Sequence, residues 1–453
     1  MSPLAPARRP EPDLAADFAE RLQPMTKDQA VVESSRCLYC YDAPCMVACP
    51  TSIDIPGFIQ RIETGDRLGA ANRILEANIM GATCARVCAV EELCEEACVL
   101  DRAQEKPIEI GRLQRYATDL VVEGGLSIPY TPGVSTGKHV AIVGGGPAGL
   151  AAAAGLRVAG HDVTIFERQP ELGGLATYGI IPLREPTEIA LWEAEQVLAL
   201  GVTARCNVEV GVDVAAEQLL ADFDAVFLSF GSGRFVADIK VAGSDAAGVD
   251  DALEFIESIR TTPAHEIPVG DHVVVVGAGN TAMDACTIAV RLGAKTVTCV
   301  YRRTEAEMTG YPNEYDHCLR EGVQFRWLTQ PLATVVDTHG SVTGLECVEV
   351  TLGATGIDGK AVPMLGTESF VVPTDHVLLA TGQNRETAVP NALGLDLDGA
   401  RPLTGLASFA TSNPKVFAGG DVILTGKELS VVDAVAQGRD AVPEIDKFLM
   451  GAQ

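Results

Sequence analysis

The chain has 453 residues, 47% of them hydrophobic, and a formal net charge of -27 at pH 7. The length predicts two or three domains. The acidic charge argues against non-specific nucleic-acid binding and against docking on an anionic membrane. The N-terminal residues lack the apolar core of a signal peptide, so we expect a soluble, cytoplasmic protein whose crowded cysteines bind metal rather than form disulfides. Of the thirteen cysteines, the scattered five are expected to be small buried hydrophobes: Cys206, Cys286, Cys299, Cys318 and Cys347.

Residues 1–25 are predicted to be a Pro-rich, disordered lead-in, and residues 26–125 a helical, Cys-rich domain. Eight cysteines are crowded into this domain: Cys37, Cys40, Cys45, Cys49, Cys84, Cys88, Cys94 and Cys98. A Gly/Pro/Ser-rich linker, Gly124–Lys138, follows.

The spacing of the eight cysteines favours iron–sulfur clusters over zinc. Zinc modules usually repeat one C-x2-C spacing. Here the gaps are two, four and three residues, then three, five and three, and Pro50 follows Cys49 as in bacterial ferredoxin motifs. Counting alone predicts two 4Fe–4S clusters with eight cysteine ligands.

After the linker, residues 139–167 read as strand, Gly-rich turn, helix and strand. Gly144, Gly146 and Gly149 form a G-x-G-x-x-G turn, which lets a pyrophosphate approach the backbone at a helix N-terminus. Glu167 ends the second strand, where an acid can accept hydrogen bonds from ribose hydroxyls. This unit is predicted to bind a dinucleotide.

Residues 272–303 repeat the unit with Gly277, Gly279 and an alanine at the third glycine position. Its second strand ends in Arg302 and Arg303, which suit a 2′-phosphate, so NADPH is favoured. The alternative is that the two arginines are simply a solvated basic pair. The nearby Glu305 keeps NADH as an alternative nucleotide for this site.

Two dinucleotide sites suggest a flavin and a nicotinamide. A strand ending in Gly-Gly-Asp places Asp421 against ribityl or phosphate oxygens, and the following helix can direct its N-terminus toward the flavin. No cysteine pair follows the first glycine turn, and Cys286 stands alone in its helix. Electrons from a reduced flavin therefore need another exit, which the N-terminal cysteines offer.

The order of these motifs resembles the small subunit of glutamate synthase and its relatives. Within that group, RCLYCYDAPCMVACPTSIDIPGFI, LGAANRILEANIMGATCARVC and PIEIGRLQRYATD resemble the N-terminal half of dihydropyrimidine dehydrogenase and the small subunit of the bacterial NAD(P)-dependent enzyme. The resemblance covers nearly the whole chain after about the first 25 residues.

The resemblance implies a ligand set that differs from the eight cysteines predicted by counting. It assigns one cluster to Cys37, Cys40, Cys45 and Cys98. It assigns the other to Cys49, Cys88, Cys94 and the side chain of Gln114, and it makes Cys84 a non-ligand. The fold implied is α/β: an α-helical domain with two 4Fe–4S clusters, then an FAD-binding domain (138–262 and 375–453) and an NAD(P)H-binding domain (263–374), both Rossmann-like.

Motifs and resemblance together define the candidate cofactor residues. Those for FAD are Gly144, Gly146, Pro147, Ala148, Gly149, Glu167, Arg168, Gly174, Leu175, Arg184, Val210, Gly420, Asp421, Ser430 and Val431. Those for NAD(P)H are Gly277, Ala278, Gly279, Asn280, Thr281, Arg302, Arg303, Ala380, Thr381 and Gly382. Thr309 matches a position that is basic in the NADPH-using relative, which weakens the preference for NADPH.

The resemblance implies an electron-input subunit. NAD(P)H gives a hydride directly to FAD, with no catalytic side chain, and single electrons leave through the clusters. The expected acceptor is a partner subunit with FMN and further clusters that reduces uracil or thymine, in a hetero-oligomer. The alternatives are a glutamate synthase small subunit, another NAD(P)H–ferredoxin-type flavoprotein, or a non-catalytic zinc-and-flavin scaffold.

Overall fold

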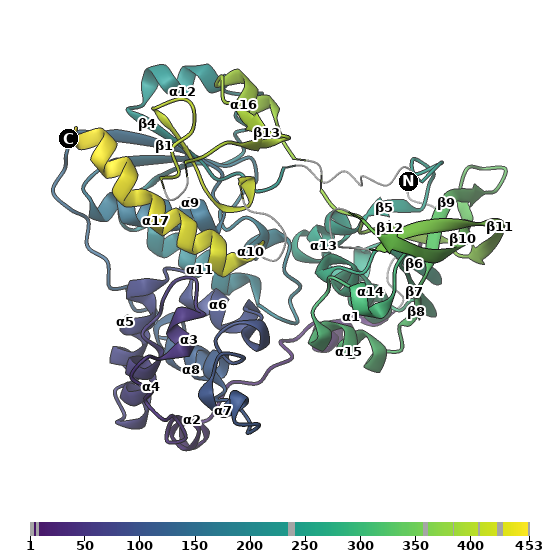
Figure 1. Ribbon diagram of the computed structural model, residues 1–453, viewed down its shortest axis with the longest axis horizontal. Helices are drawn as coiled ribbons and strands as arrows, with labels where there is room; N and C mark the ends of the chain where they lie inside the picture. The colour runs from purple at the N-terminus through teal and green to yellow at the C-terminus, as the bar shows by residue number, and fades with distance from the viewer. Residues whose placement is uncertain are drawn as a thin grey trace. The chain divides into compact units, whose positions relative to one another are not determined.

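A computed structural model of the chain describes residues 4–5, 9–233, 241–356, 361–383, 385–405, 408–423 and 429–451. The chain divides into two compact units (Figure 1). The first unit comprises Met1–Ala19, Tyr178–Leu183 and Arg234–Asn384, and the second comprises Glu20–Thr177, Arg184–Gly233 and Arg385–Gln453. Within the described residues, no helix has both the length and the apolar character needed to cross a membrane.

The second unit begins with the Cys-rich helices. They are α2 (Lys27–Ser34), α3 (Pro44–Val47), α4 (Ile55–Glu63), α5 (Arg67–Ala77), α6 (Gly81–Val87), the 3₁₀ turn η1 (Val90–Glu92), α7 (Val99–Arg102) and α8 (Ile110–Glu123). Local sequence explains α4: Asp54 accepts a hydrogen bond from the Gly57 amide at its start, and the buried Phe58, Ile59 and Ile62 recur at helical spacing. That stripe packs toward α2, α5 and α8.

The same unit contains a parallel five-stranded sheet in the order β15-β4-β1-β2-β3. The strands are β1 (His139–Val143), β2 (Asp162–Phe166), β3 (Thr203–Arg205), β4 (Ala225–Leu228) and β15 (Val416–Ala418). The remaining elements are α9 (Pro147–Val158), α10 (Leu175–Tyr178), α11 (Thr187–Leu198), α12 (Ala216–Asp222), α16 (Ala388–Ala392), the β13–β14 hairpin (Leu397–Asp398, Arg401–Pro402), η4 (Gly420–Val422) and α17 (Val431–Met450).

Helix α17 lies along α9, the helix that follows the first glycine turn (Figure 1). Gly438 makes the approach possible, because a Cβ there would lie 2.1 Å from the Ala148 carbonyl oxygen. The C-terminal helix is thereby held against the helix whose N-terminus faces the predicted phosphate site.

The first unit contains a second parallel sheet in the order β5-β12-β6-β7-β8 and an antiparallel sheet in the order β11-β10-β9. Its strands are β5 (Val249–Asp251), β6 (His272–Val276), β7 (Thr296–Val300), β8 (Gln324–Arg326), β9 (Thr329–Val336), β10 (Val342–Thr355), β11 (Ala361–Pro373) and β12 (His376–Leu379). Its helices are α1 (Glu11–Asp17), α13 (Ala252–Thr261), η2 (Ala264–Glu266), α14 (Asn280–Leu292), η3 (Glu305–Glu307) and α15 (Pro312–Arg320). The predicted α/β class with two Rossmann-like sheets is confirmed.

The boundary between the two dinucleotide-binding domains differs from the prediction. Residues 249–262 and 375–383 were assigned by sequence to the FAD-binding domain, but β12 pairs in parallel with both β5 and β6. Strands that pair across a sheet share one core, so these residues belong with the second glycine turn. A linear sequence pattern does not show which sheet a short strand joins.

The N-terminal lead-in is also corrected. Its described part contains α1, on which Leu14 is only 1% exposed and lies in the core with Ile256 and Ile288. The Arg291 guanidinium adds a hydrogen bond to the Asp17 carbonyl. The composition of this segment resembles that of a disordered tail, but burial of Leu14 and the hydrogen bond from Arg291 at the end of α1 hold it in place.

Candidate functional site: a paired cysteine site and two dinucleotide turns

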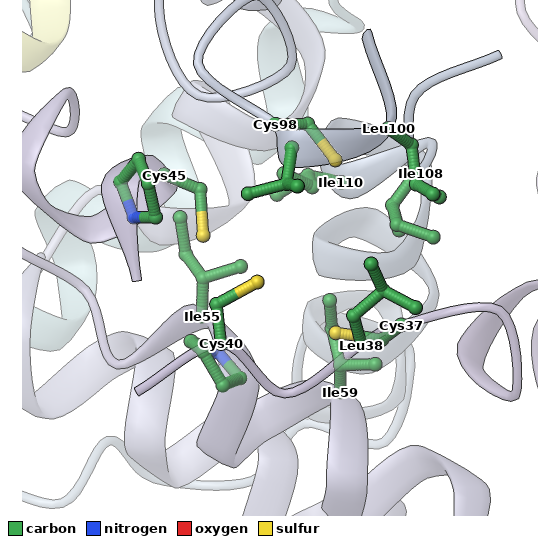
Figure 2. A pocket seen from close by; sticks show the side chains of 13 residues that line it. Cys37, Leu38, Cys40, Cys45, Ile55, Ile59, Cys98, Leu100, Ile108 and Ile110 are labelled. Atoms are coloured by element: carbon green, nitrogen blue, oxygen red, sulfur yellow. The ribbon is translucent and has the colours of Figure 1, made fainter. Parts of the chain in front are cut away.

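Four cysteines surround one cavity in the helical part of the second unit. Cys37, Cys40, Cys45 and Cys98 line it, and their sulfur atoms point inward in Figure 2. The rest of the lining is mainly apolar: Leu38, Pro44, Ile55, Pro56, Ile59, Val99, Leu100, Ile108 and Ile110. Cys49, the next cysteine along the chain, does not line this cavity. The cavity thus unites the four residues expected to ligate the first cluster.

The loop carrying three of these thiols is shaped by its backbone. Tyr39 (φ 48°) and Ala43 (φ 35°) adopt left-handed conformations that non-glycine residues seldom take. The Tyr39 hydroxyl contacts Glu63 on α4, which ties the loop to the helix bundle. This strain turns the chain around the cavity so that widely spaced cysteines share it.

Burial in the absence of iron disfavours the charged thiolates. It raises the pKa of Cys45 to about 12, with the Cys37 and Cys98 sulfurs adding to the effect, and it raises the pKa of Cys37. A buried cluster supplies the positive charge that stabilises such thiolates. Four thiols around an apolar cavity are therefore suited to a cationic iron core.

The cysteines expected at the second cluster also approach one another. Burial raises the pKa of Cys94, and the Cys49 sulfur adds to this increase. The pKa of Cys88 is raised first by a hydrogen bond with Cys84, then by burial, Cys94 and Cys49. Cys84 is 2% exposed and lies one helical turn before Cys88, so it lies beside this group of thiols. Its exclusion from the ligand set remains a proposal.

Gln114 lies on α8 and is 7% exposed. Its Nε2 donates a 2.8 Å hydrogen bond to the Gly81 carbonyl, which orients the amide so that its oxygen is the atom suited to bind iron. The role of Gln114 as a ligand remains a proposal.

The four thiols around the cavity are not gathered about a single point. Among the residues that the structure describes, no three His, Cys, Asp or Glu side chains converge closely enough to hold one metal ion. Zinc requires its ligands about 2.3 Å from a common point, whereas four thiols distributed around a cavity match a cluster.

The first glycine turn has the geometry of a phosphate site. Gly144 has φ 101°, and a Cβ there would lie 2.6 Å from the Ser229 oxygen. A Cβ on Gly149 would lie 2.1 Å from the Gly144 oxygen. Gly146 caps α9, with Pro147 in its first turn and Ala148 buried behind them. This backbone leaves free amide groups at a helix N-terminus, as a pyrophosphate requires.

Glu167 and Asp421 lie in the same unit as this turn. The Glu167 carboxylate accepts hydrogen bonds from the Gly145 amide (2.8 Å) and the Gln169 amide (2.9 Å), which hold it beside the turn. Asp421 Oδ1 is buried and has no hydrogen-bond partner among the described residues, and burial raises the pKa of Asp421 to about 6. An orphaned carboxylate oxygen fits a hydroxyl-rich cofactor such as FAD.

The other FAD candidates have varied surroundings. Arg168 is exposed, Leu175 is 39% exposed, Arg184 is half-buried, and Val210 is buried in the core beside Phe166. Gly174 and Gly420 have positive φ, and a Cβ on Gly174 would lie 2.8 Å from the Gly146 Cα. Ser430 caps α17 by accepting from the Asp433 amide, so Val431 starts that helix.

The second glycine turn resembles the first. Gly277 has φ 130°, and a Cβ there would lie 2.2 Å from the Ala380 oxygen, while Gly279 caps α14. Asn280 Oδ1 accepts a hydrogen bond from the Tyr311 amide. The predicted residues Ala278, Thr281, Ala380, Thr381 and Gly382 belong to the same unit. The buried Thr381 hydroxyl has no hydrogen-bond partner within the described ranges.

The two arginines after β7 are not equivalent. Arg302 is exposed, whereas Arg303 is half-buried with its Nε 3.9 Å from a carboxylate oxygen of Glu307. Glu307 also closes a capping box with Thr304. Arg302 is therefore accessible to a 2′-phosphate. Arg303 would have to leave the Glu307 carboxylate in order to bind that phosphate.

The cysteines of the first unit form a buried group. Cys286, Cys299 and Cys318 are fully buried, and the pKa of Cys286 is raised by burial and then by a hydrogen bond with Cys299. Cys286, alone in its helix, therefore has cysteine neighbours in space. Buried, protonated thiols are inert, so this group does not supply the accessible dithiol of a disulfide reductase.

Two residues that sequence reasoning missed connect the Cys-rich helices α2–α8 (the cysteine helices) to the helices of the sheet β15-β4-β1-β2-β3 (the flavin-type sheet). Arg439 on α17 donates to the Thr51 and Ala77 carbonyls. Glu193 on α11 accepts from the Ala82 amide at the start of α6. A detectable signal existed for Glu193, because it shares the apolar stripe of α11 with Ile189, Ala190 and Val197.

Comparisons with known proteins separate the Cys-rich N-terminal part of the chain from the part with the two glycine turns. Residues 14–126 match the family described as dihydropyrimidine dehydrogenase domain II, 4Fe-4S cluster, and residues 138–438 match the pyridine nucleotide-disulphide oxidoreductase family. The small chain of NADPH glutamate synthase from Escherichia coli is 36% identical over 98% of this chain and 96% of its own length. The NAD-dependent dihydropyrimidine dehydrogenase subunit PreT of that organism is 34% identical over 96% and 98%.

Solved structures show the same fold. FprA of Mycobacterium tuberculosis in complex with NADPH matches with a TM-score of 0.57 at 21% identity, covering 70% of this chain and 85% of FprA. Thioredoxin reductase of T. acidophilum matches with a TM-score of 0.50 at 18% identity, covering 68% of this chain and 98% of its own.

Proposed function

Because the chain belongs to the pyridine nucleotide-disulphide oxidoreductase family and carries that family's FAD- and NAD(P)-type domains behind a 4Fe-4S domain, we propose that it is the electron-input subunit of a larger enzyme. It would oxidise NAD(P)H and deliver single electrons to a partner subunit through two 4Fe–4S clusters. Bound FAD supplies the chemistry that converts one hydride into two single electrons.

The observation that carries this proposal is the direct bonding between the flavin-type sheet and the cysteine helices. Arg439, on the helix that starts at Val431, donates a 2.6 Å hydrogen bond to the Thr51 carbonyl. The Thr51 hydroxyl lies 3.3 Å from the Cys49 sulfur, a candidate ligand of the second cluster. These contacts hold the FAD candidates and the second ligand set in one rigid arrangement, as electron transfer between them requires.

Contacts between helices also indicate which of the two ligand sets lies nearer the flavin-type sheet. Helix α6, which ends before Cys88, packs against α11 and α17, so the second set is adjacent to the flavin-type sheet. Leu38 lines the first cavity and is 59% exposed. This exposure supports the proposal that the first cluster would be the one from which electrons leave for the partner.

The residues prepare this transfer by binding and orientation. The two glycine turns would offer backbone amides to phosphates, Asp421 would accept hydrogen bonds from hydroxyls of the flavin, and the apolar lining of the first cavity would keep water from the iron. No side-chain acid or base is assigned to the hydride step, so we propose no catalytic residue.

For the acceptor, we propose the FMN-containing, uracil- and thymine-reducing subunit of dihydropyrimidine dehydrogenase, on the Cys-domain motifs. The 36% identity with a glutamate synthase small chain favours a large glutamate synthase subunit as the second candidate. Co-purification from the native organism discriminates between them. Pyrimidine-dependent NAD(P)H oxidation with an FMN partner supports the first, and glutamine- and 2-oxoglutarate-dependent oxidation refutes it.

The core proposal is tested on the purified chain. Iron and acid-labile sulfide near eight per chain, together with FAD and NAD(P)H-dependent reduction of a one-electron acceptor dye, are expected. A protein containing zinc in place of iron, or one that reduces dyes equally well without iron, contradicts it.

The preference for NADPH is tested separately. Replacing Arg302 and Arg303 by alanine should lower kcat/KM for NADPH by about ten- to a hundredfold relative to NADH, because two charge-assisted hydrogen bonds to a 2′-phosphate are lost. Arg320→Ala, an exposed change in the same unit, is the control. A wild type that prefers NADH, with a ratio unchanged in the double variant, refutes the 2′-phosphate role.

A further inference from the structure

A short hydrogen-bond network reaches Cys49, a candidate ligand of the second cluster. The Thr51 hydroxyl oxygen lies 3.3 Å from the Cys49 sulfur and 3.5 Å from Nδ2 of Asn78. Thr51 and Asn78 are both 0% exposed. A hydroxyl that is removed from water and placed against a candidate ligand interacts strongly with the charge on that ligand, because the surroundings have a low dielectric.

Asn78 sets the direction in which the Thr51 hydroxyl donates. The Asn78 Oδ1 atom accepts a 2.9 Å hydrogen bond from the Met80 amide, so the side-chain amide is oriented with Nδ2 toward Thr51. Because Nδ2 can only donate, the hydroxyl accepts at this contact and its own hydrogen is directed to the Cys49 sulfur. A thiolate that binds iron carries no hydrogen, so the sulfur can only accept.

Arg439 holds the two segments that carry these side chains. Its Nη1 atom donates to the Thr51 carbonyl (2.6 Å) and to the Ala77 carbonyl (3.2 Å), and Ala77 immediately precedes Asn78. Arg439 lies on α17, the helix that begins at the FAD candidate Val431. One guanidinium therefore fixes the backbone on both sides of the Thr51–Asn78 contact, which keeps the hydroxyl in place beside the sulfur.

We propose that Thr51 is a positioning residue that raises the reduction potential of the second cluster by donating its hydroxyl hydrogen to the Cys49 sulfur. The inference rests on the proposed function, in which Cys49 binds that cluster. Hydrogen bonds to ligand sulfurs stabilise the extra negative charge of the reduced state. Reduction adds one electron to the cluster, while the hydroxyl keeps its proton and no bond to it forms or breaks. A higher potential would make the second cluster a better acceptor for an electron from FAD.

The test is an EPR-monitored redox titration of the purified holoprotein. Wild type is compared with Thr51→Val, which keeps the shape of the side chain and removes the hydroxyl. The equilibrium constant for reduction of the second cluster should fall about three- to tenfold, which is a fall of about 28–59 mV for a one-electron couple. The potential of the first cluster should not change, and iron should stay near eight per chain.

Two further variants separate the effect of the hydroxyl from that of the position. Thr51→Ser restores the donor and should return the second-cluster potential to near that of the wild type. Thr64→Val is the same substitution at an exposed threonine of the helical domain, and it should leave both potentials unchanged. The second-cluster signal is identified as the EPR signal that is lost in Cys49→Ser.

Each result decides between the explanations. A second-cluster potential in Thr51→Val equal to that of the wild type overturns the role of Thr51 and leaves the proposed function intact, whereas a wild type without clusters overturns the proposed function itself. An equal fall of the potential in Thr51→Ser also overturns the role of the hydroxyl. If Thr51→Val does not retain the cluster, pulsed ENDOR of wild-type holoprotein exchanged into D2O decides: a hydroxyl deuteron coupled to the reduced second cluster supports the hydrogen bond, and its absence refutes it.

Discussion

At the scale of single residues, the chemistry depends on polar groups that the fold has removed from water. Asp421 is the clearest case, because one carboxylate oxygen is buried without a partner in the part of the chain that the structure describes, and burial raises the pKa of the group to about 6. A buried acceptor with no donor costs free energy of folding. Such a group is retained where a ligand provides the missing hydrogen bond.

The pH dependence of FAD binding follows from Asp421. If the charged carboxylate accepts hydroxyl hydrogen bonds from FAD, affinity is full above the pKa of about 6 and falls as the pH drops through it. Asp421→Asn should bind FAD about tenfold more weakly at neutral pH and lose this dependence. Titrating FAD into flavin-depleted protein at several pH values measures the affinity and its pH dependence. Asp398→Asn, an exposed change, is the control. Equal pH profiles for wild type and Asp421→Asn would falsify the assignment.

The two neighbouring thiols of α6 are predicted to differ in role. Cys84→Ser should leave iron near eight per chain, whereas Cys49→Ser should lose about half of it together with one EPR signal. Both substitutions replace one sulfur by oxygen, so they are matched. Iron loss in Cys84→Ser would show instead that Cys84 is a ligand and would remove the reason to invoke Gln114.

At the scale of elements, helices bring together residues that are distant in sequence. Helix α17 lies on α9 and also reaches Thr51 through Arg439, and α11 holds the start of α6 through Glu193. Both helices follow FAD-candidate segments. The same packing that stabilises the sheet thus sets the separation between the two kinds of cofactor site.

The α17–α9 contact is predicted to tolerate no side chain at Gly438. Gly438→Ala should destabilise the protein by about 2–3 kcal/mol, because its Cβ would lie 2.1 Å from the Ala148 oxygen and the helices must separate. Lys447→Ala, exposed on the same helix, should change little. Denaturant unfolding followed by flavin fluorescence measures the difference. A Gly438→Ala variant as stable as wild type would mean that the helices separate without cost.

At the scale of the whole molecule, one unit combines the cysteine helices with the flavin-type sheet, and the other contains the second glycine turn. The cysteine segments have little regular structure: between Cys88 and Cys98 the described elements are one 3₁₀ turn only. The backbone hydrogen bonds of this segment join residues that are close together in the chain, so bound clusters would contribute much of what holds it to the rest of the domain.

Iron removal should therefore affect one region selectively. Amide hydrogen exchange in residues 37–49 and 88–98 is expected to rise by at least tenfold after chelation, whereas β1 and β4 should keep their protection. Mass spectrometry of peptides from holoprotein and iron-depleted protein provides the comparison. A uniform rise over the chain would show that the clusters support the global fold, and no rise would show that they do not brace these loops.

Local patterns in the sequence determined both glycine turns, the two Rossmann-like units and the Cys-rich helical region, because each depends on residues close together in the chain. Only the tertiary structure decided that residues 249–262 and 375–383 join the second sheet and that α1 is ordered by Leu14. The spacing of the cysteines did not show that Cys98 shares a cavity with Cys37 while Cys49 does not; the family resemblance implied this grouping, and the cavity contains it. The contact of Arg439 with Thr51 likewise has no local signature, because it joins residues 388 positions apart in the chain. Strand pairing, cavity lining and hydrogen bonds of this kind are properties of contacts between distant segments, and packing alone sets those contacts.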